Sequence, residues 1–299
     1  MVVKTQLQVC GVFSLKIAFE TGSLSLYGYG YEEYMKLASD MNFDAVEVWC
    51  DKKDLWPRLL RPAQRKKIKE SINQYGMKVV AILPDAFLKV RQWKLFDFRV
   101  NIAHPSAKMR RDSVRFYNTA LDVGRDLDAE VVLALPGAIE QPNMMLSKSS
   151  FRNYWDRAIE SLRECAKHAQ DVGVRLGVEN AVVCNFVDRP EELLKMLKQV
   201  GSEYVKAYVD LANGNVFAHP VEYIETLRDW LCSCIHVSDN DGSYASHLPI
   251  GMGTIDYKTC IEALKGVGWD GYLVPEIFYA KDPEGGVRKS RDALFGLLS

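Results

Sequence analysis

The chain has 299 residues, of which 48% are hydrophobic and 26% are charged, and its 38 basic residues nearly balance its 39 acidic ones. This composition is ordinary for a globular protein with a large core. Nucleic-acid binders usually carry a basic surplus that displaces phosphate counterions, so the formal net charge of -1 counts against a nucleic-acid partner.

The first residues of the chain show no targeting signal. Residues 1–19 lack the apolar region and the small-residue cleavage site of a secretory signal. No stretch of the sequence approaches the ~20 apolar residues that cross a bilayer. The seven cysteines lack the dense spacing of a disulfide scaffold, and Cys232 and Cys234 are interpreted as small core residues of one strand. We therefore expect a cytoplasmic protein with no membrane partner.

Short apolar runs rich in β-branched residues alternate with longer amphipathic segments along the chain. Each apolar run is almost continuous, which is typical of a parallel strand covered on both faces. The predicted strands lie at residues 15–19, 44–49, 77–83, 130–135, 174–179, 205–210, 232–237 and 272–277. The predicted helices lie at residues 31–41, 61–76, 106–127, 149–172, 190–201, 220–230, 257–268 and 287–298.

Strict alternation of strands and helices requires a parallel sheet with crossover helices. Eight such units can form a closed barrel or an open, doubly wound sheet. An open dinucleotide-binding sheet would carry a GxGxxG turn after its first strand, but ETGSLSLYGYG follows Phe19. The sequence therefore predicts an α/β fold, a (β/α)8 TIM barrel with parallel strands, in one domain over residues 1–299. The long loop at 84–105 is a candidate lid.

Four consecutive predicted strands, the fifth to the eighth, end in side chains that can bind a metal. These side chains are Glu179, Asp210, His236 and Glu276. In a barrel the carboxyl ends of neighbouring strands converge on one mouth, where active sites lie. Any one of them alone could instead be a helix cap, a loop hydrogen-bond partner or an exposed charge. The four together favour a site for one divalent ion, Mn²⁺, Mg²⁺ or Co²⁺, with positions left open for substrate oxygens.

Several stretches around these strand ends resemble one known family. They are GVEN (177–180), VPEI (274–277), YVDLANGN (208–215), NIAHPSAKMRRDSV (101–114) and, most specifically, IHVSDNDGSYASHLPIGMGTIDY (235–257). They are similar to motifs of the xylose-isomerase-like TIM barrels, the sugar phosphate isomerase/epimerase superfamily. The resemblance covers nearly the whole chain.

This resemblance implies a metal site and a reaction. It places the family's metal ligands on Glu179, Asp210, His236 and Glu276, and its two acid–base carboxylates on Glu179 and Glu276. The implied ion is Mn²⁺ before Mg²⁺, Co²⁺ or Zn²⁺, and it would stabilise an enediolate while one glutamate removes a proton and the other returns it. The expected substrate is a small carbohydrate or a related polyhydroxy carbonyl compound.

The sequence also departs from the keto-sugar 3-epimerases of this family. Asn185 stands where they carry a further glutamate, Asn213 where they have histidine, and Gly242 where they have arginine. These departures favour a more generic isomerase or epimerase. Ala245 replaces a zinc ligand of the endonuclease IV branch, which with the near-neutral charge counts against a nuclease.

Four further residues are candidate substrate contacts. His247 is predicted to contact a substrate hydroxyl, with a plain loop role as the alternative. Asn180 beside Glu179, and Asn213 near Asp210, are weaker candidates. Trp49 could form a sugar platform or pack in the core. His168, in the middle of a predicted helix, is interpreted as structural.

Two other functions use the same residues. A lyase of the inosose dehydratase or C-glycoside-cleaving type would follow the same enolate chemistry with β-elimination in place of reprotonation. A noncatalytic sugar-binding barrel is opposed by the presence of both glutamates. A homo-oligomer formed through helix packing is compatible with the sequence.

Overall fold

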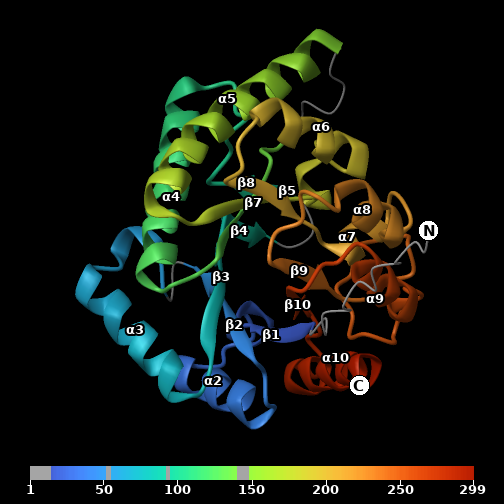
Figure 1. Cartoon of the computed structure of the whole chain (residues 1–299). Helices are drawn as coiled ribbons and strands as arrows, with labels where there is room; N and C mark the ends of the chain where they lie inside the picture. The colour runs from blue at the N-terminus through green and yellow to red at the C-terminus, as the bar shows by residue number, and fades with distance from the viewer. Residues whose placement is uncertain (1–14, 52–54, 92–94, 140–147) are drawn as a thin grey trace, which may run out of the picture.

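The computed structural model describes residues 15–51, 55–91, 95–139 and 148–299. Eight parallel strands form its centre, and helices surround them (Figure 1). In sequence order these strands are β1 (Lys16–Glu20), β2 (Ala45–Cys50), β3 (Lys78–Pro84), β6 (Val131–Ala134), β7 (Arg175–Glu179), β8 (Val205–Tyr208), β9 (Cys234–Val237) and β10 (Tyr272–Pro275).

The sheet curls into a nearly closed barrel. Its order is β8-β7-β6-β3-β2-β1-β10-β9, so β8 and β9 are the two ends. Isolated parallel bridges join these ends, Ala207 to Leu231 and Asp210 to His236. The His236 amide donates to the Val209 carbonyl at 2.9 Å, and the Ala207 amide donates to the Trp230 carbonyl at 2.8 Å. The predicted (β/α)8 TIM barrel is therefore confirmed.

The helices pack around the outside of the strands. In this position the apolar stripe of each helix and the outward faces of the strands bury one another. Their bounds are α1 (Gly22–Ser25), α2 (Tyr31–Asp40), α3 (Pro62–Gln74), α4 (Ala107–Asp126), α5 (Lys148–Val172), α6 (Pro190–Val200), α7 (Leu211–Asn215), α8 (Pro220–Leu227), α9 (Tyr257–Gly266) and α10 (Pro283–Leu298), with 3-10 turns η1 (Pro57–Leu59) and η2 (Val182–Cys184). No helix in the described part of the chain is both long and apolar enough to cross a membrane.

The barrel interior is closely filled by the apolar runs that predicted the strands. β2, β3 and β6 are buried along almost their whole length. Cys232 and Cys234 are both buried and free, as expected for core residues. His168 on α5 lies 3.1 Å from Asp122 on α4, which fits its interpretation as a structural residue.

The segment at 84–105, predicted as one long loop, contains two additional strands. Strand β4 (Phe87–Arg91) pairs antiparallel with β5 (Leu95–Phe98). The stretch that follows this hairpin is fastened to the loop after β6, because the Asn101 side chain donates to the Ala138 carbonyl and accepts from the Ala138 amide. Gly137 adopts a φ of 100°, and a Cβ there would meet the Ala103 Cβ at 2.5 Å. A glycine is therefore required where these two loops cross.

Candidate metal centre

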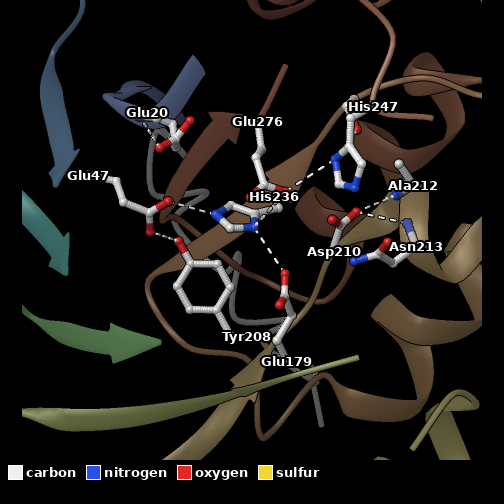
Figure 2. Close-up of polar contacts among 12 residues, drawn as sticks. Glu20, Glu47, Glu179, Tyr208, Asp210, Ala212, Asn213, His236, His247 and Glu276 are labelled. Atoms are coloured by element: carbon white, nitrogen blue, oxygen red, sulfur yellow. Dashed lines mark hydrogen bonds and ion pairs between the residues drawn. The ribbon is translucent and has the colours of Figure 1, made fainter. Parts of the chain in front are cut away.

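Glu179, Asp210, His236 and Glu276 converge at the carboxyl end of the barrel (Figure 2). Glu179 ends β7, His236 lies in β9, Glu276 follows β10, and Asp210 lies two residues beyond β8. Each offers one nitrogen or oxygen atom, and these atoms all lie within 4.8 Å of one another. Asp210 and His236 are fully buried, and the two glutamates are 7% exposed. The structure therefore brings together all four ligands predicted from the sequence.

Asp210 is fixed by the helix that follows it. Its Oδ1 accepts hydrogen bonds from the amides of Ala212 at 2.7 Å and Asn213 at 2.9 Å, so the residue caps α7. Its Oδ2 is buried without a hydrogen-bond partner among the described residues. A buried carboxylate oxygen is costly to leave unpaired. Oδ2 is therefore the atom of Asp210 that is free to bind a cation.

His236 is oriented from both sides of its ring. Its Nε2 lies 2.7 Å from Glu47 Oε1, and the Tyr208 hydroxyl donates to the other oxygen of Glu47. An ionised carboxylate only accepts, so Nε2 is the donor in this pair. Nδ1 then faces the cluster, 3.2 Å from Glu179 and 3.6 Å from Glu276. A carboxylate behind the imidazole is the arrangement that orients histidine ligands of metals.

The charges in this cluster are poorly balanced by the protein alone. Burial, and then the neighbouring carboxylates, raise the pKa of Glu179, and they raise the pKa of Glu276 well above its ordinary value. Burial alone would lower the pKa of His236, but Glu47 and Glu276 hold it well above the ordinary range. These pKa shifts show that, without a cation, Glu179, Glu276 and His236 favour their protonated forms. A cation would replace those protons.

The residues present fit a divalent metal ion. Three carboxylates and one imidazole are hard and borderline donors that suit Mn²⁺, Mg²⁺, Co²⁺ or Zn²⁺. The unpartnered Asp210 Oδ2 and the Nδ1 atom of His236 both lie in this cluster. This buried cluster could therefore hold a metal ion, and the donor set does not select one metal.

Sequence reasoning missed two buried glutamates beside the site, Glu20 and Glu47. Both are 0% exposed. Glu20 accepts from the Gly22 amide and from the amide and hydroxyl of Ser23, and burial followed by the charge of Glu47 raises its pKa to about 7. Glu47 interrupts the apolar run DAVEVW, whereas Glu20 is the last residue of β1, KIAFE. A charged residue inside an apolar strand, or at its end, was the signal that could have found them.

The imidazole of His247 lies next to Glu276 and packs against the ring of Phe278. His247 Nδ1 is 3.2 Å from Glu276 Oε2 and 3.2 Å from the Ser238 hydroxyl. The His247 ring is 4.9 Å from the Phe278 ring, and Trp49 meets Phe278 edge-on at 6.4 Å. Trp49 is half-buried, and its Nε1 has no hydrogen-bond partner among the described residues. His247 therefore lies beside the cluster, and both His247 and Trp49 pack against Phe278.

The two asparagine candidates have different surroundings. The Asn180 side chain donates to the Asp210 carbonyl at 2.9 Å and accepts from the Asp210 amide at 2.8 Å, so it positions a ligand. Asn213 is 6% exposed and lies on α7 beside Asp210, where Figure 2 shows its side chain next to the cluster.

The fold is that of a known class of barrel. The sequence pattern of the family described as xylose isomerase-like TIM barrel matches residues 35–296, and the chain belongs to this family. Among its relatives, a protein of Methanocaldococcus jannaschii is 28% identical over 276 residues, which cover 90% of this chain and 87% of the relative. Fructoselysine 3-epimerase of Escherichia coli O157:H7 is 25% identical over 279 residues, 89% of this chain and 93% of the enzyme.

Solved structures share the fold at lower sequence identity. A D-tagatose 3-epimerase-like protein superposes with a TM-score of 0.76 at 24% identity, covering 95% of this chain and 97% of that one. The IOLI protein, whose structure holds a zinc atom, superposes with a TM-score of 0.75 at 17% identity, covering 95% of this chain and 98% of that one.

Proposed function

We propose that this protein is a metal-dependent isomerase or epimerase of a ketose or a related polyhydroxy carbonyl compound. The family and the similarity to fructoselysine 3-epimerase over most of both chains support a sugar epimerase or isomerase. The donor set supports metal dependence. Mn²⁺ is the first ion to test because the family resemblance implies it.

The single observation that carries the proposal is the placement of Glu179 and Glu276. Glu179 ends β7 and Glu276 follows β10, and both approach His236 Nδ1, at 3.2 Å and 3.6 Å. Both are nearly buried, at 7% exposed. When a sugar binds between these two carboxyl groups, one would remove a proton from one face of a carbon and the other would return a proton on the opposite face.

In the proposed reaction one of the two glutamates takes the proton from the carbon next to the sugar carbonyl. When bound, a divalent cation would supply electrostatic stabilisation of the negative charge that develops on the sugar oxygens. The second glutamate delivers a proton to the opposite face, which inverts that carbon, or to the neighbouring carbon, which moves the carbonyl. His247, held against Glu276, is placed to bind a substrate hydroxyl.

The test is NMR of the Mn²⁺-loaded protein in D₂O with a panel of ketoses, ketose phosphates, fructosamines and inososes. We expect an isomeric product that carries solvent deuterium on the carbon next to the carbonyl. A product lighter by one water would show a lyase. Turnover without any deuterium exchange would show hydride transfer and contradict the two-glutamate mechanism.

A further inference from the structure

An open cavity of about 430 Å³ lies at the end of the barrel opposite the metal cluster. Its walls come from residues at the beginnings of strands. Lys16, Lys78 and Arg175 are the first residues of β1, β3 and β7, and Lys206 is the second residue of β8. The cluster of Glu179 and its neighbours lies at the other ends of the strands, so the two sites do not share a residue.

Positive charge dominates this cavity although the chain as a whole is nearly neutral. Four cations line it, and Glu130 and Asp270 are the carboxylates among its lining residues. Lys78 pairs with Glu130 at 3.2 Å. Within the described parts of the chain, Lys16, Arg175 and Lys206 form no ion pair. Three cationic side chains therefore line one opening without forming an ion pair among the described residues.

Aromatic rings bring these cations together. The ammonium groups of Lys16 and Lys78 lie 5.4 Å and 5.1 Å from the centroid of the same ring, Tyr272. The Lys206 ammonium lies 5.6 Å from the centroid of Trp230. Cation–π contacts stabilise single cations but do not cancel their mutual repulsion. Like charges within about a Debye length, ~8 Å at physiological salt, still repel one another.

A purely structural role would explain part of this arrangement. Lysine stems can cover the apolar floor of a barrel while their charged ends stay in water, and this end of a barrel generally serves stability. That role needs the stems and not the charges. It does not account for cations from four separate strands around one cavity, where walls such as Trp269 and Tyr272 would focus their field.

We propose that this cavity binds a small multivalent phosphate-type anion, either free phosphate or pyrophosphate or the phosphate group of a monoester. The cavity has room for such an anion, and Lys16, Arg175 and Lys206 are free to make charge-assisted hydrogen bonds to its oxygens. Arg175 offers a planar fork that matches two phosphate oxygens at once. Ser233 also lines this cavity.

The test is calorimetric titration of the metal-loaded protein with inorganic phosphate, pyrophosphate and glycerol 3-phosphate. The variant is Lys16→Met with Lys206→Met, which keeps most of each stem and removes both charges. The matched control is Lys66→Met with Lys289→Met, two exposed lysines on α3 and α10. We expect saturable binding of at least one of the three anions, which also identifies its source, and a loss of affinity of at least about tenfold in the variant alone.

Two controls separate this site from the metal cluster. Binding should survive removal of the metal by EDTA, and the affinity for Mn²⁺ should be unchanged in the Lys16→Met, Lys206→Met variant. The proposal would be overturned if none of the three anions saturates the wild-type protein at about 10 mM, a concentration well above the Kd expected of a functional site. Equal binding by wild type and variant, or binding that disappears with the metal, would overturn it as well. None of these outcomes depends on the epimerase proposal.

Discussion

The orientation of His236 depends on a residue that does not itself belong to the metal cluster. Glu47 on β2 accepts hydrogen bonds from His236 Nε2 and from the Tyr208 hydroxyl. All three side chains of this hydrogen-bonded series are fully buried. This contact fixes which ring nitrogen faces Glu179 and raises the basicity of that nitrogen. Glu47 therefore positions His236, the proposed metal ligand.

We predict that Glu47→Gln lowers Mn²⁺ affinity by about 10- to 100-fold, the usual effect of losing a carboxylate behind a histidine ligand. Calorimetric titration of the metal-free variant with Mn²⁺ measures this affinity. Glu20→Gln is the matched control, because Glu20 is equally buried and makes no hydrogen bond to His236. Equal losses in the two variants would assign the effect to total negative charge near the site and not to the contact with His236.

A second prediction concerns the proposed acid and base. Glu179→Gln and Glu276→Gln each retain an oxygen for the metal but lose the titratable proton site. Turnover should fall by a factor on the order of 10²–10⁴, with a much smaller loss of metal affinity. In Asp210→Asn, by contrast, metal affinity should fall at least as much as turnover. If both glutamine variants turn over substrate at close to the wild-type rate, neither glutamate transfers the proton.

Some residues of the site could be predicted from the sequence alone, and others could not. The four proposed ligands could be predicted because they end four consecutive apolar runs and so form a set. Glu20 also ends an apolar run but stands apart from that set, and the role of Glu47 depends on strands that meet in space, since Glu47 lies 189 residues from its partner His236. The exchange of hydrogen bonds between Asn180 and the Asp210 backbone is equally invisible before β7 and β8 are aligned.

Individual elements were predicted where local signals mark their ends. Helix α6 begins with Pro190 at its first position and ends at Gly201, which has a φ of 70°. The extra strands β4 and β5 were not predicted, although FLKVR and LFDF have the composition of short strands. Their pairing is antiparallel and local, so it does not follow the strand–helix alternation on which the rest of the prediction depended.

At this scale we predict opposite effects of two glycine-to-alanine substitutions. Gly201→Ala should lower the free energy of unfolding by about 1–2 kcal/mol, because a Cβ is strained in the left-handed conformation. Gly296→Ala should raise it by about 0.5–1 kcal/mol, because Gly296 is exposed within α10 and a Cβ there would meet nothing within 4 Å. Urea unfolding of the two variants measures both changes. A loss of stability in Gly296→Ala, or no loss in Gly201→Ala, would contradict the stated conformation of that glycine.

The alternation of strands and helices by itself left two arrangements open for the whole molecule. Alternating strands and helices are common to barrels and open sheets, and the absence of a GxGxxG turn decided between them. What closes the molecule is the contact between β8 and β9, and it includes the bridge between Asp210 and His236. Two predicted metal ligands thus lie at the seam of the barrel. Stability and metal binding should therefore be coupled in this protein.

The charge state of the whole metal site gives that coupling a pH dependence. Without metal, Glu179, Glu276 and His236 have raised pKa values in the folded chain, and the pKa of Glu20 is raised from 4.5 to about 7. The folded state then holds more protons than the unfolded state, so stability is present below the unfolded pKa values and is lost as the pH rises through the folded ones.

We therefore predict that the metal-free protein becomes less stable between about pH 5 and pH 8, and that added Mn²⁺ restores more stability at pH 8 than at pH 5. Metal binding requires deprotonated carboxylates and a neutral imidazole, so its affinity rises with pH while the metal-free protein weakens. Thermal unfolding with EDTA and with excess Mn²⁺ across this range measures both trends. Asp210→Asn is the control, because it should lose the Mn²⁺-dependent increase at every pH. A metal-induced increase that is the same at pH 5 and pH 8 would mean that the four side chains do not exchange protons for the ion.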